Sequence, residues 1–440
     1  MMKDSVREVL QYVEQNDVKF IRLAFCDIFG RQKNISITPR ELPRAFESGI
    51  SFDASAIYGF TGVEQSDLFL LPDEKTLSVL PWRPSQGRVI RLYSSIVHPN
   101  GSAFEADSRT ILKKAVSYAA KKGYLCKIGT ECEFYLFENN KHSIPTNIPH
   151  DFGGYCDISP LDKGENIRRQ ICLTLEEMGI LPERSHHEQG PGQNEIDFHY
   201  GNALTAADNF ITFRSATKAV AFENGLFASF LPKPFANYSG SGMHVNLSLY
   251  HQQRNLFESD KDGNHSLECQ NFLAGILSHI QEMTLFLNPL TNSYHRFGAF
   301  EAPKYITWSH QNRSQLVRIP AARGQYSRME LRSPDMCCNP YLAFSLLIYA
   351  GLDGIEQKTT LCPSTDIDLY NCNHTLSHLK KLPMNLGKAI QLAEQSTFLT
   401  TVFPEKLLQK YLLKKKAEWS AYCHAKDKQQ LEHELYFNLE

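Results

Sequence analysis

The amino-acid sequence predicts an α+β protein with two domains. Residues 1–104 combine one amphipathic helix with several strand-like segments, and from residue 105 strands and helices alternate irregularly until a mainly helical C-terminal portion. The chain has 440 residues, which is enough to bury a large core and to form more than one domain. We therefore expect a small N-terminal domain at 1–104 and a larger domain at 105–440.

The N-terminal domain is expected to begin with a short helix. Residues Ser5–Glu8 match a capping box, and the apolar residues that follow recur at helical spacing. Val18–Cys26 and Asn34–Ile37 are typical of strands and flank a turn. Residues 49–73 are richer in Gly, Ser, Asp and Pro, and strand-like patterning returns at 77–92.

The larger domain mixes predicted helices with predicted strands. Residues 108–120 favour a helix. Asn339 as the cap and Pro340 in the first turn indicate the start of another helix, which is apolar nearly all round and is therefore expected to be buried. Pro404 opens a C-terminal helix, whose lysines at 414–416 are expected to face solvent.

The charge balance and the cysteine content exclude several classes of protein. Lys and Arg number 46 against 48 Asp and Glu, and the net charge of -2 excludes a basic nucleic-acid coat and a disordered chain. The first residues include charged side chains and no apolar signal-peptide core, and no segment approaches the length of a membrane span. Eleven cysteines without a C-x-x-C pair favour a reducing compartment. We expect a cytoplasmic protein that has no nucleic acid and no membrane as a partner.

Four strand-like segments each place charged side chains on one face. Because side chains alternate along a strand, residues two apart share a face, as Glu131 and Glu133 do in residues 127–136. The other three segments group Gln193, Glu195 and Asp197, with Glu188 just upstream; His244, Asn246 and Ser248; and Arg328, Glu330 and Arg332. The simplest interpretation of any one segment is a strand with a wet outer face.

The composition of the four faces together favours a metal site. They carry five Glu and one His, almost without the Lys and Thr of a solvent face. Neighbouring carboxylates repel one another unless a cation lies between them. An oxygen-rich ligand set suits Mg²⁺ or Mn²⁺, its size requires two ions, and paired ions of this kind usually clamp phosphoryl oxygens.

Five arginines fall within 37 residues: Arg296, Arg313, Arg318, Arg328 and Arg332. Guanidinium groups are natural partners of phosphate and carboxylate oxygens, although a surface salt bridge is the alternative for any one of them. No G-x-x-x-x-G-K-[ST] loop occurs, so metals and arginines would have to hold a nucleotide. From the residues alone we expect a metal-dependent phosphoryl-transfer enzyme of unspecified substrate.

Six segments resemble, in order, the motifs of the glutamine synthetase family, in its bacterial type I short form. They are Gly129–Phe134 (GTECEF), His186–Phe198 (HHEQGPGQNEIDF), Gly240–Asn246 (GSGMHVN), Asn292–Arg296 (NSYHR), Asn312–Ser314 (NRS) and Arg328–Arg332 (RMELR). The resemblance implies a β-grasp N-terminal domain and a catalytic domain with a curved antiparallel sheet flanked by helices. It also implies a dodecamer of two stacked six-membered rings, with active sites between subunits. The implied reaction joins ammonium to the γ-carboxylate of glutamate with ATP, through a γ-glutamyl phosphate.

The resemblance also implies roles for individual residues. Two to three Mg²⁺ or Mn²⁺ ions per subunit are expected. Ligands of one metal would be Glu133, Glu188 and Glu195, and ligands of a second would be Glu131, His244 and Glu330. The substrate would be held by Arg296, Arg332 and the loop of Ser239 and Gly240, and the phosphoryl group in transit by Arg313 and Arg318. The nucleotide would be held by Arg328 at its phosphates and by Tyr200 and Ser248 at adenine.

Two further residues resemble family residues that act on the amine or exclude water. Asp53, in Phe52–Ile57 (FDASAI), resembles the aspartate that takes a proton from ammonium across a subunit boundary. Glu301 resembles the flap glutamate that shields the acyl phosphate from water. Tyr370 falls near a tyrosine that some relatives carry as an adenylylation site, but the usual residues do not follow it, so we expect it to stay unmodified.

The sequence also departs from the family pattern. Ser239 replaces an asparagine, Ala54 and Ala56 replace a glycine and a serine of the ammonium loop, and Asn246 replaces a histidine. These departures leave open a ligase that uses a polyamine or another amine. A separate alternative, from a different class, is a catalytically silent oligomer that binds glutamine. All six expected metal ligands are present, which disfavours the silent oligomer.

Overall fold

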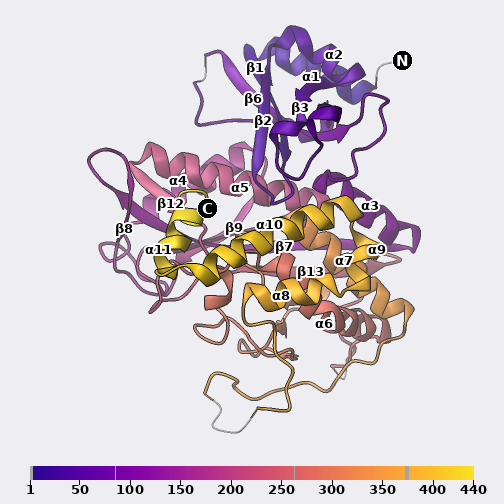
Figure 1. Cartoon of the computed structure of the whole chain (residues 1–440), viewed down its shortest axis with the longest axis vertical. Coiled ribbons are helices and arrows are strands. Elements are labelled where there is room, and N and C mark those ends of the chain that lie inside the picture. The colour runs from indigo at the N-terminus through magenta and orange to yellow at the C-terminus, as the bar shows by residue number, and fades with distance from the viewer. Residues whose placement is uncertain (1–2, 85, 262, 372–375) are drawn as a thin grey trace.

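The computed structural model describes residues 3–84, 86–261, 263–371 and 376–440. Two sheets of unequal size organise the chain: the smaller belongs to an N-terminal lobe, drawn in indigo at the top of Figure 1, and the larger runs through the body beneath it. The structure confirms the predicted α+β class. The exact boundary at residues 104 and 105 stays a prediction.

The N-terminal sheet has a β-grasp arrangement with a parallel pair at its centre. Its strands are β1 (Val18–Cys26), β2 (Gln32–Ile37), β3 (Ile50–Asp53), β4 (Asp67–Pro72), β5 (Ser78–Val79) and β6 (Arg88–Val97). They follow the order β2-β1-β6-β4-β3, with β5 on β6, and only β1 and β6 run parallel. The Gly-rich residues 49–73 therefore contain two strands that composition alone does not indicate.

The first helix differs from its predicted start. Helix α1 (Asp4–Gln15) has Lys3 at its N-cap position and no side-chain cap. The predicted capping box is wrong because the helix begins at Asp4, which places Ser5 inside the first turn and not at the N-cap. Ser5 Oγ donates to Glu74 Oε1, at 3.2 Å, and so joins the helix to the segment before β5. Helix α2 (Leu42–Ser48) follows β2.

The large sheet is built around one long strand, β7 (Tyr124–Asn139). Directly paired with it are β8 (Pro145–Pro149), β10 (Gln193–Phe198), β11 (Gly201–Asn202), β12 (Leu226–Ser229) and β13 (Met243–His251). The remaining strands are β9 (Pro182–His187), β14 (Arg254–Asn255), β15 (Trp308–His310), β16 (Val317–Ile319) and β17 (Met329–Leu331). The path is β15-β16-β17-β13-β7-β10-β9, antiparallel except between β15 and β16.

The described α-helices of the larger domain are α3 (Ser108–Lys121), α4 (Glu165–Glu177), α5 (Ala203–Glu223), α6 (Leu267–Leu287), α7 (Pro340–Glu356), α8 (Leu386–Glu394), α9 (Thr397–Val402), α10 (Glu405–His424) and α11 (Lys428–Glu432). Helices α3, α4 and α5 pack against strands of the large sheet. Both α3 and α5 contact β7, and Ile128, Cys132, Phe134 and Leu136 of β7 are fully buried. The alternation of β7 is thus confirmed, and its carboxylates face away from this core.

Helix α7 begins as predicted. Its cap, Asn339, accepts a hydrogen bond from the backbone of Tyr341, and the helix packs closely on α6. A Cβ atom at Gly275 of α6 would lie only 2.2 Å from the Ala350 carbonyl oxygen, so this approach requires glycine. In α10, Lys415 is buried at 3% exposure and pairs with Glu418, so the prediction of a fully solvated lysine run is wrong at this position.

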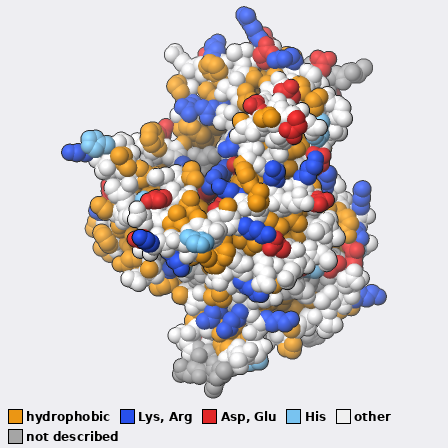
Figure 2. Space-filling view, in the orientation of Figure 1, with side chains coloured by type: hydrophobic (Ala, Val, Ile, Leu, Met, Phe, Trp, Pro, Cys, Tyr) orange, Lys and Arg blue, Asp and Glu red, His pale blue; other side chains and the backbone are white. Residues whose placement is uncertain are grey.

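No described helix combines the length and the apolar character that crossing a bilayer requires. In the face shown in Figure 2, basic and acidic side chains are interspersed, which agrees with the nearly balanced charge of the chain. Any charge-based binding therefore depends on local clusters.

Candidate active site

Two rows of charged side chains cross the polar face of the large sheet. The first row consists of residues that are directly opposite one another on β9, β10, β7 and β13: Arg184, Asp197, Glu131 and His244. The second row lies two residues further along and consists of His186, Glu195 and Glu133. Residues two apart on a strand are separated by roughly 6.6 Å, so the strand geometry alone sets the spacing of the rows.

The first row supplies Glu131 and His244 to one of the two expected metal clusters, and Glu330 on β17, the strand next to β13, completes it. His244 Nδ1 lies 2.9 Å from Glu131 Oε2 and 3.8 Å from Glu330 Oε1. One possible ligand atom from each of these three buried residues falls within 4.8 Å of the others. Asn246 donates to Glu131 Oε1 at 3.2 Å, so the residue that replaces the family's histidine supports this carboxylate.

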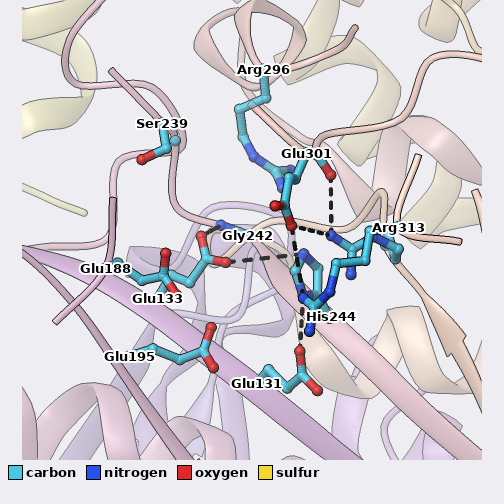
Figure 3. A network of polar contacts seen from close by, with 12 residues as sticks. Glu131, Glu133, Glu188, Glu195, Ser239, Gly242, His244, Arg296, Glu301 and Arg313 are labelled. Atoms are coloured by element: carbon cyan, nitrogen blue, oxygen red, sulfur yellow. Dashed lines mark hydrogen bonds and ion pairs between the residues drawn. The ribbon is translucent and has the colours of Figure 1, made fainter. Parts of the chain in front are cut away.

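The second cluster contains Glu188, Glu195 and a histidine that the sequence analysis does not assign. His186 lies 3.5 Å from Glu188 and 3.3 Å from Glu195, and the three residues form a set within 4.8 Å. Glu133, the third expected ligand, lines the same cavity, where its Oε2 accepts a 2.7 Å hydrogen bond from the Gly242 backbone. Figure 3 shows the carboxylates of Glu131, Glu133, Glu188 and Glu195 gathered on one side of His244.

The electrostatics of these acids fit a divalent cation. Burial, and then the charge of Glu133, raises the pKa of Glu188 to about 7. Burial and the neighbouring carboxylates also raise the pKa of Glu195 well above its usual value. Burial acts in the same direction on Glu131, but the hydrogen bond with His244 takes the pKa of Glu131 below its ordinary value. Acids this crowded and buried carry their charges at lower cost when a dication lies among them, and an oxygen-rich set suits Mg²⁺ or Mn²⁺.

Arginines also line the cavity, namely Arg184, Arg296, Arg313, Arg318 and Arg328, whereas Arg332 does not reach the lining. Arg332 is fully buried and forms an ion pair with Glu330, and Glu330 forms a second ion pair with Arg318. Arg296 is buried and donates to the backbone oxygens of Ser333 and Pro334. A Cβ atom at Gly242 would lie 2.6 Å from Arg296 Nη2, so a glycine at this position leaves space for the guanidinium. These cations are fixed in place beside the acids.

A short loop brings Glu301 over the arginines. Phe300 and Glu301 have φ angles of 50° and 64°, the left-handed region that side chains other than glycine rarely adopt. Glu301 Oε2 lies 3.3 Å from Arg332 Nη2 and 3.7 Å from Arg313 Nη1, and Gln189 donates to Oε1. Figure 3 shows this carboxylate pointing toward Arg313.

The cavity has a volume of about 610 Å³. Next to it is a pocket whose wall includes Gly129, Tyr200, Ser248 and Arg328. A Cβ atom at Gly129 would approach Tyr200 Cβ to 3.2 Å, so glycine lets this part of the pocket wall pack tightly. Arg328 Nε donates to Asn246 Oδ1 at 2.8 Å. The residues expected at the nucleotide therefore line a separate pocket beside the cavity of the acids.

Gln193 on β10 joins the loop of Ser239 and Gly240 to the acids, and all three residues line the cavity. Ser239 Oγ donates to Gln193 Oε1, and Gln193 Nε2 donates to the Gly240 carbonyl and to Glu133 Oε2. Sequence reasoning grouped Gln193 with the acids but gave it no role.

Asp53 and Tyr370 lie outside the cavity lining. Asp53 is exposed at the end of β3 in the N-terminal sheet and accepts hydrogen bonds from Ser55. Tyr370 is partly buried and its hydroxyl has no hydrogen-bond partner among the described residues. Burial raises the pKa of this hydroxyl above its ordinary value, although the charge of Arg332 acts in the opposite direction. Residues 372–375, which follow this tyrosine, lie outside the described part of the chain.

Arg184 and His186 are the functional candidates that the sequence analysis misses. A signal was present, since both precede Glu188 at spacings of two and so share its face. Residues 182–187 are almost entirely polar, so no apolar alternation marks them as a strand.

Comparisons with known proteins cover nearly the whole chain. Residues 17–99 match the family model described as glutamine synthetase, beta-grasp domain, and residues 105–435 match glutamine synthetase, catalytic domain. Proteins named glutamine synthetase from Clostridium saccharobutylicum, Methanosarcina mazei and Thermus thermophilus are 44%, 42% and 40% identical to this chain. These matches span 94–96% of this chain and 95–96% of each relative. Solved structures of GmaS, one as an ADP complex and one without ligand, superpose with a TM-score of 0.87 at 30% identity, over 97% of this chain and 98% and 99% of theirs.

Proposed function

The chain belongs to the glutamine synthetase family, and from that premise we propose that it joins ammonia to the γ-carboxylate of L-glutamate at the expense of ATP. A glutamate γ-carboxylate oxygen attacks the γ-phosphorus of ATP and ADP leaves. The amine nitrogen then attacks the acyl carbon of γ-glutamyl phosphate, and phosphate leaves as the amide forms. The product is L-glutamine.

One observation carries this proposal: acids of two rows and fixed arginines line a single cavity beside a second pocket. Phosphoryl transfer depends mainly on positioning and on charge neutralisation, and this arrangement supplies both. The acid clusters would hold two to three Mg²⁺ or Mn²⁺ ions, which neutralise phosphoryl oxygens when bound. The ADP complex of GmaS supports nucleotide binding by this fold.

The remaining groups have roles that follow from their positions. Arg332 and Arg296 are buried cations suited to the substrate carboxylate, and Arg313 and Arg318 are suited to the phosphoryl group in transit. Glu301, on its strained loop, excludes water from the acyl phosphate. Tyr200 and Ser248 receive adenine, and Arg328 receives the nucleotide phosphates.

The assembly belongs to the same proposal. Asp53 does not line the cavity of its own chain, so a role as general base requires the cavity of another subunit. We therefore propose a dodecamer of two hexameric rings, in which an N-terminal domain at 1–104 completes the catalytic domain at 105–440 of a neighbour. The cysteines of the described chain are unpaired, which supports a reducing, cytoplasmic setting.

A second candidate changes only the amine. The similarity to GmaS structures at 30% identity keeps a ligase with another amine acceptor open, whereas relatives named glutamine synthetase reach 44%. The test incubates the purified protein with glutamate, ATP, Mg²⁺ and a panel that contains ammonium, methylamine and polyamines. Saturation with ammonium as the preferred substrate supports glutamine synthesis. Preference for a larger amine would contradict glutamine synthesis and support the ligase with another amine acceptor.

A further inference from the structure

Two pockets meet at three residues of the described chain. The pocket that contains Tyr200 and the cavity that contains the acid clusters share Glu131, Arg184 and Arg328 in their linings. If adenine occupies the first pocket and glutamate the second, the triphosphate that joins them has to pass this junction. Glu131 and Arg328 already have expected roles there, and Arg184 has none.

The contacts of Arg184 fix part of its guanidinium and leave part available. Arg184 is directly opposite Asp197, to which Nε donates, and Nη2 lies 3.3 Å from Glu131 Oε1. Its side chain is still 54% exposed, and Nη1 has no hydrogen bond to a described residue. Asp197 is 4% exposed and its Oδ1 atom is buried without a hydrogen bond among the described residues. Because a guanidinium has five N–H donors, the contacts with Asp197 and Glu131 leave three of them for a ligand.

We propose that Arg184 binds phosphate oxygens of the nucleotide and that Asp197 is the positioning residue that holds it. This inference rests on the proposed function, because it assumes that the pocket of Tyr200 receives ATP. Charge-assisted hydrogen bonds from a guanidinium fork are the strong contacts to phosphate, and the location at the junction favours the phosphate chain over the base. Asp197 holds the side chain at the junction, since its carboxylate binds Nε, and with Nη2 also bonded to Glu131 the Nη1 atom and the second N–H of Nη2 are left for the phosphates.

The test measures equilibrium binding of AMP, ADP and ATP, with Mg²⁺, to the wild type and to Arg184→Gln. Exposed Arg169 on α4 supplies a control variant, Arg169→Gln, with the same change of net charge. We expect Arg184→Gln to weaken ATP roughly 10-fold, ADP by a similar or smaller factor and AMP least, because the loss follows the phosphate chain. Arg169→Gln should bind all three like the wild type. Equal losses for the three nucleotides, or no loss, would overturn the inference.

Asp197 is tested by the steady-state constants for each substrate. Asp197→Asn should raise the KM for ATP severalfold and leave the KM for glutamate unchanged. The double variant Arg184→Gln/Asp197→Asn removes both charges, so it avoids an unpaired buried acid, and its ATP affinity should equal that of Arg184→Gln alone. Additive losses in the double variant would show that Asp197 does not act through Arg184. A wild type that binds no nucleotide would refute the proposed function itself, whereas a wild type that binds ATP beside an unaffected Arg184→Gln would refute only this inference.

Discussion

Arg332 Nη2 lies 3.3 Å from Glu301 Oε2, so a fully buried arginine that directly follows β17 pairs with a carboxylate on a strained surface loop. The two partners differ in mobility, because strand packing fixes the arginine whereas the glutamate side chain is 41% exposed. Any anion that binds Arg332 must therefore share it with Glu301 or displace the loop. Under the proposed function, this pair links binding of the substrate carboxylate to the position of the Glu301 loop.

The first prediction concerns that pair. Glu301→Gln removes the competing charge, so glutamate should bind the resting enzyme severalfold more tightly in calorimetric titration. The neutral side chain should also exclude water less well from the acyl phosphate, so the ratio of ADP to glutamine produced should rise. Glu177→Gln, an exposed change on α4, is the control and should alter neither measurement. Unchanged affinity and unchanged coupling in Glu301→Gln would remove the loop from the chemistry.

The second prediction concerns Glu133 as a metal ligand. Glu133→Gln should lower activity by at least roughly 100-fold, since changes that only support a ligand already cost 10- to 100-fold in metal affinity. The amide removes a charge beside Glu188 and Glu195, so without metal the variant should unfold at the same temperature as the wild type or higher. Thermal melts with and without Mn²⁺ measure both effects. A variant that keeps the full stabilisation by Mn²⁺ would show that Glu133 is not a ligand.

The third prediction joins assembly to catalysis. Asp53→Ala and Arg332→Ala subunits should each be nearly inactive, because a positioned general base contributes roughly 10²- to 10⁴-fold in rate. When the two are mixed and reassembled, some interfaces combine an intact Asp53 with an intact catalytic domain, so partial activity should return. Mass spectrometry verifies the mixed oligomers. If verified mixtures stay inactive, Asp53 does not act on a neighbouring subunit.

The fourth prediction concerns acid stability. Glu440 is buried and pairs with Arg31 near the N-terminal sheet at 2.8 Å and with Arg214 of α5 at 2.6 Å. Burial alone would raise the pKa of Glu440, but the charges of Arg214, Arg31 and Lys218 lower it to about 2. Because the folded pKa is below the unfolded value, the stabilisation is complete above about pH 4.5 and is lost as the pH falls toward 2.

Urea unfolding of the wild type and of Glu440→Gln at several pH values tests this prediction. The difference in the free energy of unfolding should be constant between pH 6 and 7 and should shrink below pH 4.5, by a total on the order of 3 kcal/mol. Exposed Glu434→Gln is the control, and its difference should depend little on pH. A Glu440→Gln difference that stays the same from pH 7 to pH 3 would contradict the lowered pKa.

Local patterns made part of this site predictable. Alternation is a property of neighbouring residues, so the polar faces of β7, β10 and β13 can be predicted before any strand is paired. The pairing itself is set by contacts between distant segments. Nothing in the sequence around Arg184 reveals that Asp197 and Glu131 lie beside it. The two rows form only when β9, β10 and β7 pair in this register.

The predictions that the structure contradicts fail because of contacts between distant segments. Ser5 has a local partner available for a cap but bonds to Glu74, and Lys415 lies in a basic run but is covered by other parts of the chain. Strands β3 and β4 form in a stretch of turn-forming composition because β4 pairs with β6, which lies beyond it in the chain. In each case a contact far along the sequence outweighs a local preference.

The two rows on β7 restrict how the length of this protein can change. A substitution alters one side chain. One residue inserted or deleted between Glu131 and Glu133 would instead reverse the face of every side chain on one side of that position, which would bring a carboxylate into the core and an apolar group into the cavity. The chemistry of β7 can therefore change by substitution but not by a change of length. Insertions and deletions are better accommodated in connecting loops such as 140–144, which lie between β7 and β8 and outside both rows.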